Sequence, residues 1–184
     1  MNDRIENPNA TSIVRQRQAP LIEQYREDPR AALIPKQART VTERDAGPFH
    51  VSVSVDGPYP RTAWELGIDD KIGGDNDLPN AAEMMLAALA GCYESTLRMV
   101  ADRLAVSIVS LEVIARGDVD ARGCLAMDPA VRVGFPSIEM SVHLEVEEGT
   151  DPRRVEMLYA AADRLCVTKD TLENGVPITI ARDP

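Results

Sequence analysis

Hydrophobic and polar residues alternate along several short stretches of the chain, and this period of two is typical of β-strands with one buried face. The alternating stretches are residues 39–42, 49–55, 108–119, 137–147 and 176–180. We expect the first two to form a hairpin, because the residues between them are rich in turn formers. We expect the next two to pair as antiparallel strands, and the last to form a final strand.

A period near 3.6 residues predicts two main helices. The first begins after Asn80 and runs to about residue 104; Asn80 and Glu83 have the spacing of a capping box, in which each side chain bonds the backbone N–H of the other. Its apolar positions fill two adjacent stripes, so we expect a largely buried helix. The second helix begins at Asp151, which precedes a proline, and ends at Cys166.

The remaining stretches give weaker signals. We expect a short helix over residues 12–25 and at most one helical turn over residues 167–175. Residues 57–79 are rich in Gly, Pro and Asp, which predicts an irregular loop, and long loops of this kind often carry function. Its aromatic residues, Tyr59 and Trp64, fit either the wall of a pocket or an anchor for the loop.

The order of these elements predicts an α+β domain with helices packed against antiparallel sheet. A chain of 184 residues with 44% hydrophobic content supports one sizeable core. We therefore expect a polar, partly helical arm over residues 1–37 and a single domain over residues 38–184. A helix that is apolar on two stripes needs more cover than one small sheet gives, which favours a homodimer.

The charge of the chain excludes several classes of partner. Its net charge of -10 and pI near 4.7 repel phosphate backbones and anionic membranes, so we expect no nucleic acid and no membrane as partner. The longest apolar stretch, residues 84–92, is too short to span a bilayer, and the N-terminal residues do not resemble a leader. These features predict a cytoplasmic protein.

Three scattered cysteines and two histidines limit the chemistry. The cysteine spacing suggests neither a disulfide framework nor a zinc site, and we expect no metal. His50 and His143 fall on the polar side of predicted strands, which disfavours a histidine triad. Cys92 follows small residues in the long helix, Cys166 ends the next helix, and Cys124 lies in a loop. Each cysteine fits a packing residue as well as a reactive one.

Three segments resemble the OsmC/Ohr family, which comprises osmotically inducible protein C and organic hydroperoxide resistance protein. The helix at residues 78–92 (LPNAAEMMLAALAGC) is similar to the family's helix that leads to the peroxidatic cysteine, and residues 165–172 (LCVTKDTL) to its resolving-cysteine segment. Residues 117–123 (GDVDARG) resemble a turn between these two segments. The resemblance implies the OsmC-like α+β fold and an intertwined homodimer with its thiol site near the subunit interface.

The resemblance also implies a reaction. Cys92 would be the peroxidatic cysteine of a thiol-dependent peroxidase for organic hydroperoxides, and Cys166 would resolve its sulfenic acid as a disulfide. An arginine would lower the pKa of Cys92; Arg44 matches the family's turn best, with Arg39 and Arg61 as alternatives. No cofactor is implied beyond an external dithiol reductant.

Two positions depart from the family pattern. The family's catalytic glutamate aligns with Ala82, which leaves Glu83 one residue late and more consistent with a helix cap, and Val167 replaces the usual proline after the second cysteine. These departures keep two alternatives open. One is an OsmC-like protein that binds a small apolar or electrophilic ligand; the other is a non-catalytic dimer with two core cysteines.

Overall fold

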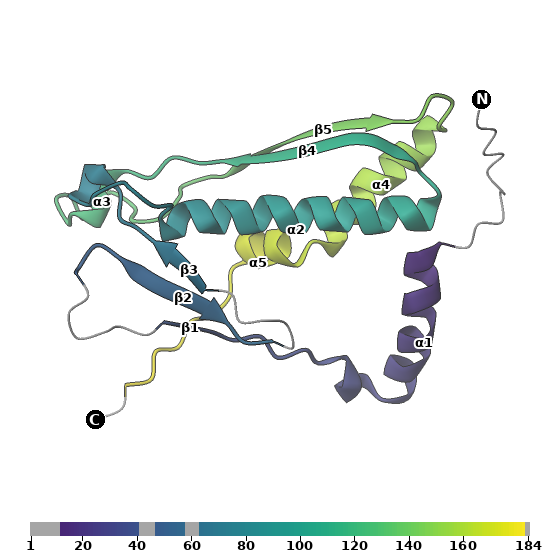
Figure 1. The fold of residues 1–184 in the computed structure, drawn as a ribbon, viewed down its shortest axis with the longest axis horizontal. Coiled ribbons are helices and arrows are strands. Elements are labelled where there is room, and N and C mark those ends of the chain that lie inside the picture. Colours follow the sequence, from purple (N-terminus) through teal and green to yellow (C-terminus); the bar gives the residue numbers. More distant parts are fainter. Residues whose placement is uncertain (1–11, 41–46, 58–62, 183–184) are drawn as a thin grey trace. The chain divides into compact units, whose positions relative to one another are not determined.

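The computed structural model describes residues 12–40, 47–57 and 63–182. Figure 1 shows helices and strands together, which confirms the predicted mixture of α and β structure. The helices are α1 (Ile13–Glu27), α2 (Ala81–Leu104), α3 (Ala121–Cys124), α4 (Pro152–Leu165) and α5 (Val167–Asn174), with short turns η1 (Pro29–Ala32) and η2 (Asp70–Ile72). The strands are β1 (Ala38–Thr40), β2 (Val51–Val55), β3 (Ala63–Leu66), β4 (Ile108–Arg116) and β5 (Glu139–Val146). No helix in the described part of the chain is long and apolar enough to cross a membrane.

The chain divides into two compact units. The first takes residues up to 33, 91–113 and from 142 onward, and the second takes residues 34–90 and 114–141. The helix α2 and the strands β4 and β5 contribute to both units. Cys92 and Cys166 belong to the first unit, and Cys124 belongs to the second. The domain boundary expected at residue 37 stays a prediction.

The second unit contains a three-stranded antiparallel sheet in the order β1-β2-β3. The pairing of β1 with β2 confirms the predicted hairpin partners, whereas most of the turn between them lies outside the described residues. Strand β3 was not expected, because residues 57–79 were predicted to be irregular throughout. This four-residue strand lies in a stretch rich in Pro and Gly, and its Trp64 lies opposite Val53 of β2. A cross-strand neighbour of this kind stabilises a strand that local sequence does not reveal.

Helix α2 begins with the predicted capping box. The backbone N–H of Asn80 donates to the Glu83 carboxylate at 2.8 Å, and the N–H of Glu83 donates to the Asn80 side chain at 3.0 Å. The expectation of a largely buried helix is wrong for this chain. Only one stripe is buried, and the opposite face is exposed, including Met99 at 45%. The residues of the buried stripe are Leu89, Tyr93, Thr96, Leu97, Val100 and Ala101.

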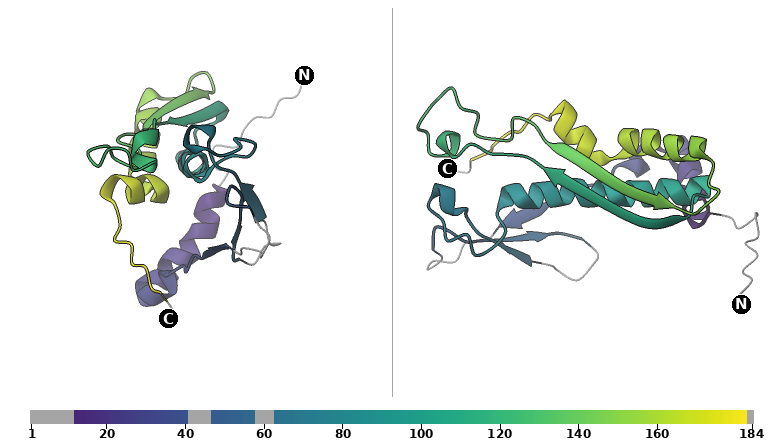
Figure 2. Two further views of the ribbon diagram at one scale, coloured as in Figure 1. Left: turned by 90° about the vertical axis from the view of Figure 1, so that its left-hand side faces the viewer. Right: turned by 90° about the horizontal axis from the view of Figure 1, so that it is seen from above.

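Strands β4 and β5 form a two-stranded sheet, and Figure 2 shows them side by side. The N–H of Glu147 donates to the carbonyl of Ser107 at 3.0 Å, and the Ser110 hydroxyl bonds Glu145 at 3.1 Å. Because the partner positions move in opposite directions along the chain, the pair is antiparallel. The predicted strand pair is therefore confirmed.

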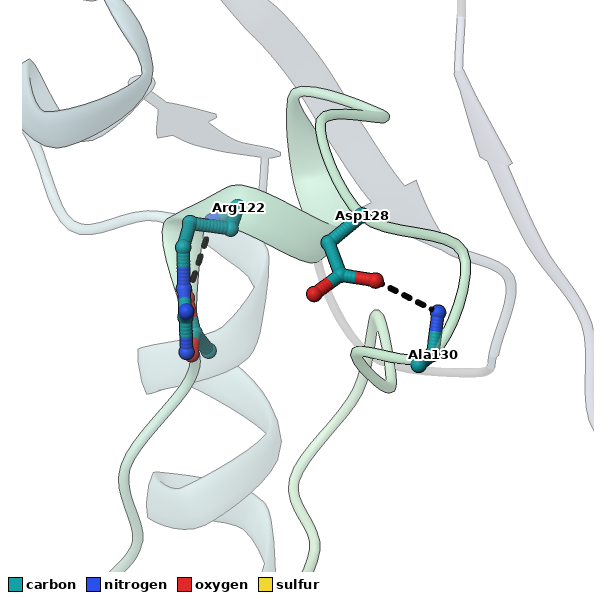
Figure 3. Close-up of polar contacts among 4 residues, drawn as sticks. Arg122, Asp128 and Ala130 are labelled. Atoms are coloured by element: carbon teal, nitrogen blue, oxygen red, sulfur yellow. Dashed lines mark hydrogen bonds and ion pairs between the residues drawn. The ribbon is translucent and has the colours of Figure 1, made fainter.

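The segment between β4 and β5 begins with the short helix α3, so Cys124 ends a helix rather than lying in a plain loop. Arg122 forms an ion pair with Asp120, which also caps α3. Four residues past the helix, the Asp128 carboxylate accepts a hydrogen bond from the N–H of Ala130 at 2.9 Å (Figure 3). Local bonds of this kind order a segment that has little regular structure.

Helix α4 begins as predicted, with Asp151 accepting a hydrogen bond from the N–H of Arg153 at 2.9 Å. It buries Leu158 and Ala162 and ends before Cys166. Helix α5 follows at once and spans eight residues, so the prediction of at most one turn is wrong. The extra length has a physical cause, because Cys166 caps both helices: its N–H bonds the carbonyl of Ala162, and its sulfur accepts from the N–H of Lys169.

The predicted final strand, residues 176–180, is absent from the described structure, where this segment is neither helix nor strand. Its alternating apolar side chains are highly exposed, with Ile178 at 85% and Ile180 at 78%. Pro177 has no backbone N–H to offer to a neighbouring strand. The period-two pattern is present, but no strand of the described structure pairs with it.

The predicted N-terminal helix is confirmed as α1. Ser12 accepts a hydrogen bond from the N–H of Arg15 at 3.0 Å, and its hydroxyl donates to Asp102 near the end of α2. The N–H of Val14 donates to the same carboxylate at 3.0 Å. The Arg15 guanidinium donates to the carbonyl of Arg103 at 2.7 and 3.1 Å. These bonds tie the start of α1 to the last turn of α2.

Candidate thiol site

The structure brings two of the three cysteines together. Cys92 is half-buried on α2, and Cys166 is completely buried between α4 and α5. Both are free thiols in the first unit, and each affects the pKa of the other, so their side chains lie near one another. Cys166 was predicted at a helix end, and this position is correct.

The first turn of α5 supplies the other contacts of Cys92. The first backbone N–H groups of a helix have no partner within the helix, so they are free to bond a nearby acceptor. Here the N–H groups of Val167 and Thr168 and the Thr168 side chain favour the charged form of Cys92 and lower its pKa. The neighbouring N–H of Lys169 donates to Cys166 at 3.5 Å. The first turn of α5 therefore acts on both cysteines.

These contacts change the acidity of Cys92. Burial disfavours the thiolate, but the hydrogen bonds from the Thr168 side chain and N–H, the Cys166 thiol and the N–H of Val167 together outweigh it, so the pKa of Cys92 is lowered. Hydrogen bonds and positive dipoles at a helix N-terminus favour the charged form of a thiol. Cys92 is therefore the more nucleophilic sulfur of the pair.

The acidity of Cys166 changes in the opposite direction. Burial raises its pKa, the N–H of Lys169 lowers it, and the negative charge of Cys92 raises it. Of the two thiols, Cys92 therefore ionises the more readily. This arrangement pairs a more acidic thiol with a less acidic one nearby.

A polar network surrounds the pair within the first unit. Tyr93 is 4% exposed, and its hydroxyl donates to the carboxylate of Asp163 on α4 at 2.9 Å. Burial, followed by the bond to Asp163, raises the pKa of Tyr93. Glu173, followed by the nearby charges of Asp163 and Cys166, raises the pKa of Lys169. Lys169 therefore stays positively charged close to Cys166.

The structure describes one of the three candidate activating arginines. Arg44 and Arg61 lie outside the described residues. Arg39 is described, but it lies on β1 in the second unit and pairs with Asp56. Within the described residues, the groups that lower the pKa of Cys92 come from residues 166–168. The role of Arg44 stays a prediction.

Glu83 also has a structural partner, since its carboxylate accepts the N–H of Asn80 in the capping box. This agrees with its interpretation as a helix cap. Ala82, at the position of the family's glutamate, carries no acid. His50 bonds Asp77 at 3.0 Å and is exposed, and His143 is exposed on β5. The described residues contain no cluster of His, Cys, Asp or Glu that could hold a metal ion.

A cavity of about 420 Å³ lies entirely within the second unit. Its wall is mainly apolar, with Ile68, Leu86, Val119 and Phe135, and it includes the third cysteine, Cys124. Its charged lining residues are Asp69, Lys71, Glu83 and Asp118. Trp64 is part of β3 and is not among the lining residues, and Tyr59 lies outside the described residues. Sequence analysis placed Cys124 in a loop, so its place in a cavity wall is a new finding.

Sequence analysis did not predict Thr168 and Val167 as site residues. Their contacts depend on α5 beginning directly after Cys166, and the predicted single turn was too short to suggest a helix start. The sequence nevertheless contains a signal for a helix that begins after Cys166. Thr168 and Lys169 follow the cysteine, Asp170 lies in the first turn, and Gly175 ends the helix with a positive φ of 67°.

Comparisons with known proteins agree with this architecture. An OsmC-like protein of unknown function from Vibrio cholerae matches with a TM-score of 0.61 at 12% identity, covering 77% of this chain and 95% of that protein. An organic hydroperoxide resistance protein from Legionella pneumophila matches with a TM-score of 0.51 at 21% identity, covering 76% and 90%. A further one from Elizabethkingia anophelis matches with a TM-score of 0.53 at 19% identity, covering 77% and 91%.

These identities are low, so the structural matches establish the fold. No curated protein matches the sequence. The sequence pattern of the family described as OsmC-like protein matches residues 74–181, which is more than half of the chain and includes Cys92 and Cys166. The chain belongs to the OsmC-like protein family.

Proposed function

We propose that the protein is a thiol-dependent peroxidase that reduces organic hydroperoxides. The observation that carries this proposal is the opposite change in acidity of two neighbouring cysteines: the pKa of Cys92 is lowered, and the pKa of Cys166 is raised. A thiolate is the form of cysteine that attacks peroxides. The solved relatives named as organic hydroperoxide resistance proteins support this class of substrate.

The reaction has three steps. The Cys92 thiolate attacks the terminal oxygen of the hydroperoxide, the O–O bond breaks, and the leaving alkoxide takes a proton to become an alcohol. Cys92 is then a sulfenic acid. The sulfur of Cys166 attacks it, forms a disulfide and releases water. An external dithiol reduces the disulfide and returns two thiols.

Two further features belong to this proposal. Arg44 is the residue that we propose as an additional activator of Cys92, by the resemblance described above. The need for a dithiol reductant fits a reducing compartment, so we place the protein in the cytoplasm. Residues 38–184 form the proposed catalytic domain, and residues 1–37 form the arm that precedes it.

The direct test is rapid mixing of the reduced protein with cumene hydroperoxide, followed by thiol counting and mass mapping. We expect fast loss of two thiols and a disulfide between Cys92 and Cys166. Cys92→Ser abolishes the reaction, because it removes the nucleophile. Cys166→Ser stops the reaction at a Cys92 sulfenic acid, because the resolving sulfur is gone. Cys124→Ser is the matched control and keeps the full reaction.

Slow oxidation of the wild-type protein, no faster than in the urea-unfolded chain, would rule out the peroxidase. It would favour the second candidate function, binding of a small apolar or electrophilic ligand. The cavity next to Cys124 is the observation that favours this function, since apolar cavities of this size are typical small-molecule sites. An apolar fluorescent probe would then bind, and Phe135→Trp, which fills the cavity, would weaken its binding.

We also propose that the protein is a homodimer. The exposed apolar residues Val176, Ile178 and Ile180 alternate like a strand that lacks a partner, and a second chain could provide one. Sedimentation equilibrium should then show a mass of two chains. Ile178→Asp combined with Ile180→Lys should shift the protein towards a single chain, whereas Val133→Lys, at another exposed apolar position, should not. A wild-type protein of single-chain mass would contradict this proposal.

A further inference from the structure

Two hydrogen bonds join α2 to α4 within the first unit, and they lie well apart along the helices. The Tyr93 hydroxyl of α2 donates to the Asp163 carboxylate of α4 at 2.9 Å. The Arg154 guanidinium, near the start of α4, donates to the carbonyl of Leu104, the last residue of α2, at 3.4 Å. The bonded positions advance along α2 and go back along α4. The two helices therefore run antiparallel.

The positions of these two bonds set the register of the helices. The bonded residues are eleven positions apart on α2 and nine positions apart on α4, which corresponds to about 16 Å and about 14 Å of helix. In this register, position 92 of α2 lies level with positions 164–166 at the end of α4. Cys92 is therefore level with Cys166, the residue that ends α4.

The bond made by Tyr93 is the one that lies beside the cysteines. Tyr93 follows Cys92 in the sequence, and Asp163 lies three residues, slightly less than one helical turn, before Cys166. Tyr93 is 4% exposed, so packing fixes its ring. The N–H of Cys166 bonds the carbonyl of Ala162 at 3.1 Å, so Cys166 moves together with α4. A bond between these two positions therefore holds the backbones of both cysteines.

We propose that Tyr93 and Asp163 are positioning residues of the thiol site, whose bond holds α4 in the register that brings the Cys166 sulfur to Cys92. The proposal rests on the peroxidase function and adds what sets the rate of disulfide closure. In that step the Cys166 sulfur forms a bond with the sulfur of the Cys92 sulfenic acid, and the S–O bond breaks. The hydroxyl leaves as water with the proton of the Cys166 thiol.

Disulfide closure is sensitive to the register of the helices. A disulfide requires Cα atoms about 4.4–6.8 Å apart, and a displacement of about 1 Å can slow a reaction about a hundredfold. Cys166 is completely buried, and its sulfur accepts the N–H of Lys169 at 3.5 Å, so its side chain has little freedom to compensate for a shifted helix. The attack of Cys92 on a hydroperoxide has no such requirement, because the peroxide comes from solution.

The test removes the bond without leaving either partner unpaired. Tyr93→Phe combined with Asp163→Leu replaces both partners by apolar groups of similar shape, a change that costs little stability. Ser12→Ala is the matched control, because the Ser12 hydroxyl also donates to an aspartate of α2, Asp102, but near the far end of that helix. Both variants are made in a Cys124→Ser parent, in which the two cysteines of the site are the only thiols.

The first measurement separates the two steps after rapid mixing with cumene hydroperoxide. Dimedone traps the sulfenic acid, and mass mapping follows the disulfide. For the double variant we expect the sulfenic acid to form at the parent rate and the disulfide to close about tenfold more slowly, because the two sulfurs are no longer held in register. The dimedone adduct of Cys92 should therefore accumulate. Ser12→Ala should match the parent in both steps.

The second measurement needs no hydroperoxide. At equilibrium with reduced and oxidised glutathione, the parent should form the disulfide between Cys92 and Cys166. A bond that holds the two thiols together and a disulfide that joins them stabilise each other. For the double variant we therefore expect an equilibrium constant for the disulfide that is about tenfold smaller, which is a reduction potential about 30 mV higher. Ser12→Ala should keep the parent potential.

A double variant that closes its disulfide at the parent rate, or keeps the parent potential, would overturn the proposal. Equal slowing of both steps would also overturn it, because the bond would then support the fold of the site rather than its register. Failure of the peroxidase function gives a different result: the parent forms no sulfenic acid faster than the unfolded chain, and the glutathione equilibrium still decides on the register. A parent that forms no disulfide with glutathione would contradict the register itself.

Discussion

Leu158→Ala is expected to lower the free energy of unfolding by about 3 kcal/mol, which is typical of removing a buried leucine side chain. Leu158 is completely buried on α4. It lies on the same helix face as Ala162 and Cys166, because the three positions are four residues apart. The variant would leave a void beneath the face that ends at Cys166. Urea unfolding followed by circular dichroism measures the effect.

The matched control for this prediction is Leu165→Ala, a leucine on the same helix that is 45% exposed. It makes the same chemical change with little burial, so its expected cost is below about 1 kcal/mol. Equal losses in the two variants would contradict the prediction, because they would show that helix propensity rather than core packing sets the cost.

Tyr93→Phe is expected to lower the free energy of unfolding at pH 7 by about 1–2 kcal/mol, because the carboxylate of Asp163 loses its donor. The effect should also depend on pH. The pKa of Tyr93 is raised in the folded protein by burial and then by Asp163. Its contribution to stability is therefore complete below the pKa of an unfolded tyrosine, about 10, and is lost as the pH rises above that value.

The measurement is urea unfolding of both proteins at pH 7 and at pH 11. We expect the wild type to lose more stability than Tyr93→Phe over this interval, so that the difference between them becomes smaller. A double-mutant cycle with Asp163→Asn isolates the bond between the two side chains. An unchanged difference at both pH values, or a cycle without coupling, would show that the bond adds nothing to stability.

The elements that the sequence predicts well are those with local signals. The capping box of Asn80 and Glu83 marks the start of α2, and Asp151 marks the start of α4; each bond is made between residues two or three positions apart. Such contacts form wherever the helix forms, so a sequence pattern reveals them.

Strands are predicted less well because a strand depends on a partner that is distant in the sequence. Residues 176–180 have a clear alternation, yet no described strand pairs with them. The opposite occurs at β3, where four residues with weak local signals form a strand because β2 lies beside them. The burial of α2 was overestimated for the same reason. Apolar residues predict burial only where another element packs against them.

The site was predicted in part. Cys92 and Cys166 were identified through the resemblance to the OsmC/Ohr family, and in the structure each affects the pKa of the other; their catalytic roles stay a prediction. Composition and spacing alone leave each cysteine as an ordinary packing residue. Thr168 was missed because it acts on the pKa of a cysteine that is 76 positions away in the sequence. A contact of this kind belongs to the tertiary fold, and no local pattern encodes it.

Cys166 caps both α4 and α5, so the proposed disulfide would change how well α5 covers this cysteine. As a thiol, its sulfur holds the N–H of Lys169 and keeps the start of α5 closed over a completely buried atom. If the proposed disulfide with Cys92 moves this sulfur, that N–H loses its acceptor. The oxidised protein would then fray at the first turn of α5. The disulfide would then be accessible to a bulky reductant, whereas Cys166 is not accessible in the reduced protein.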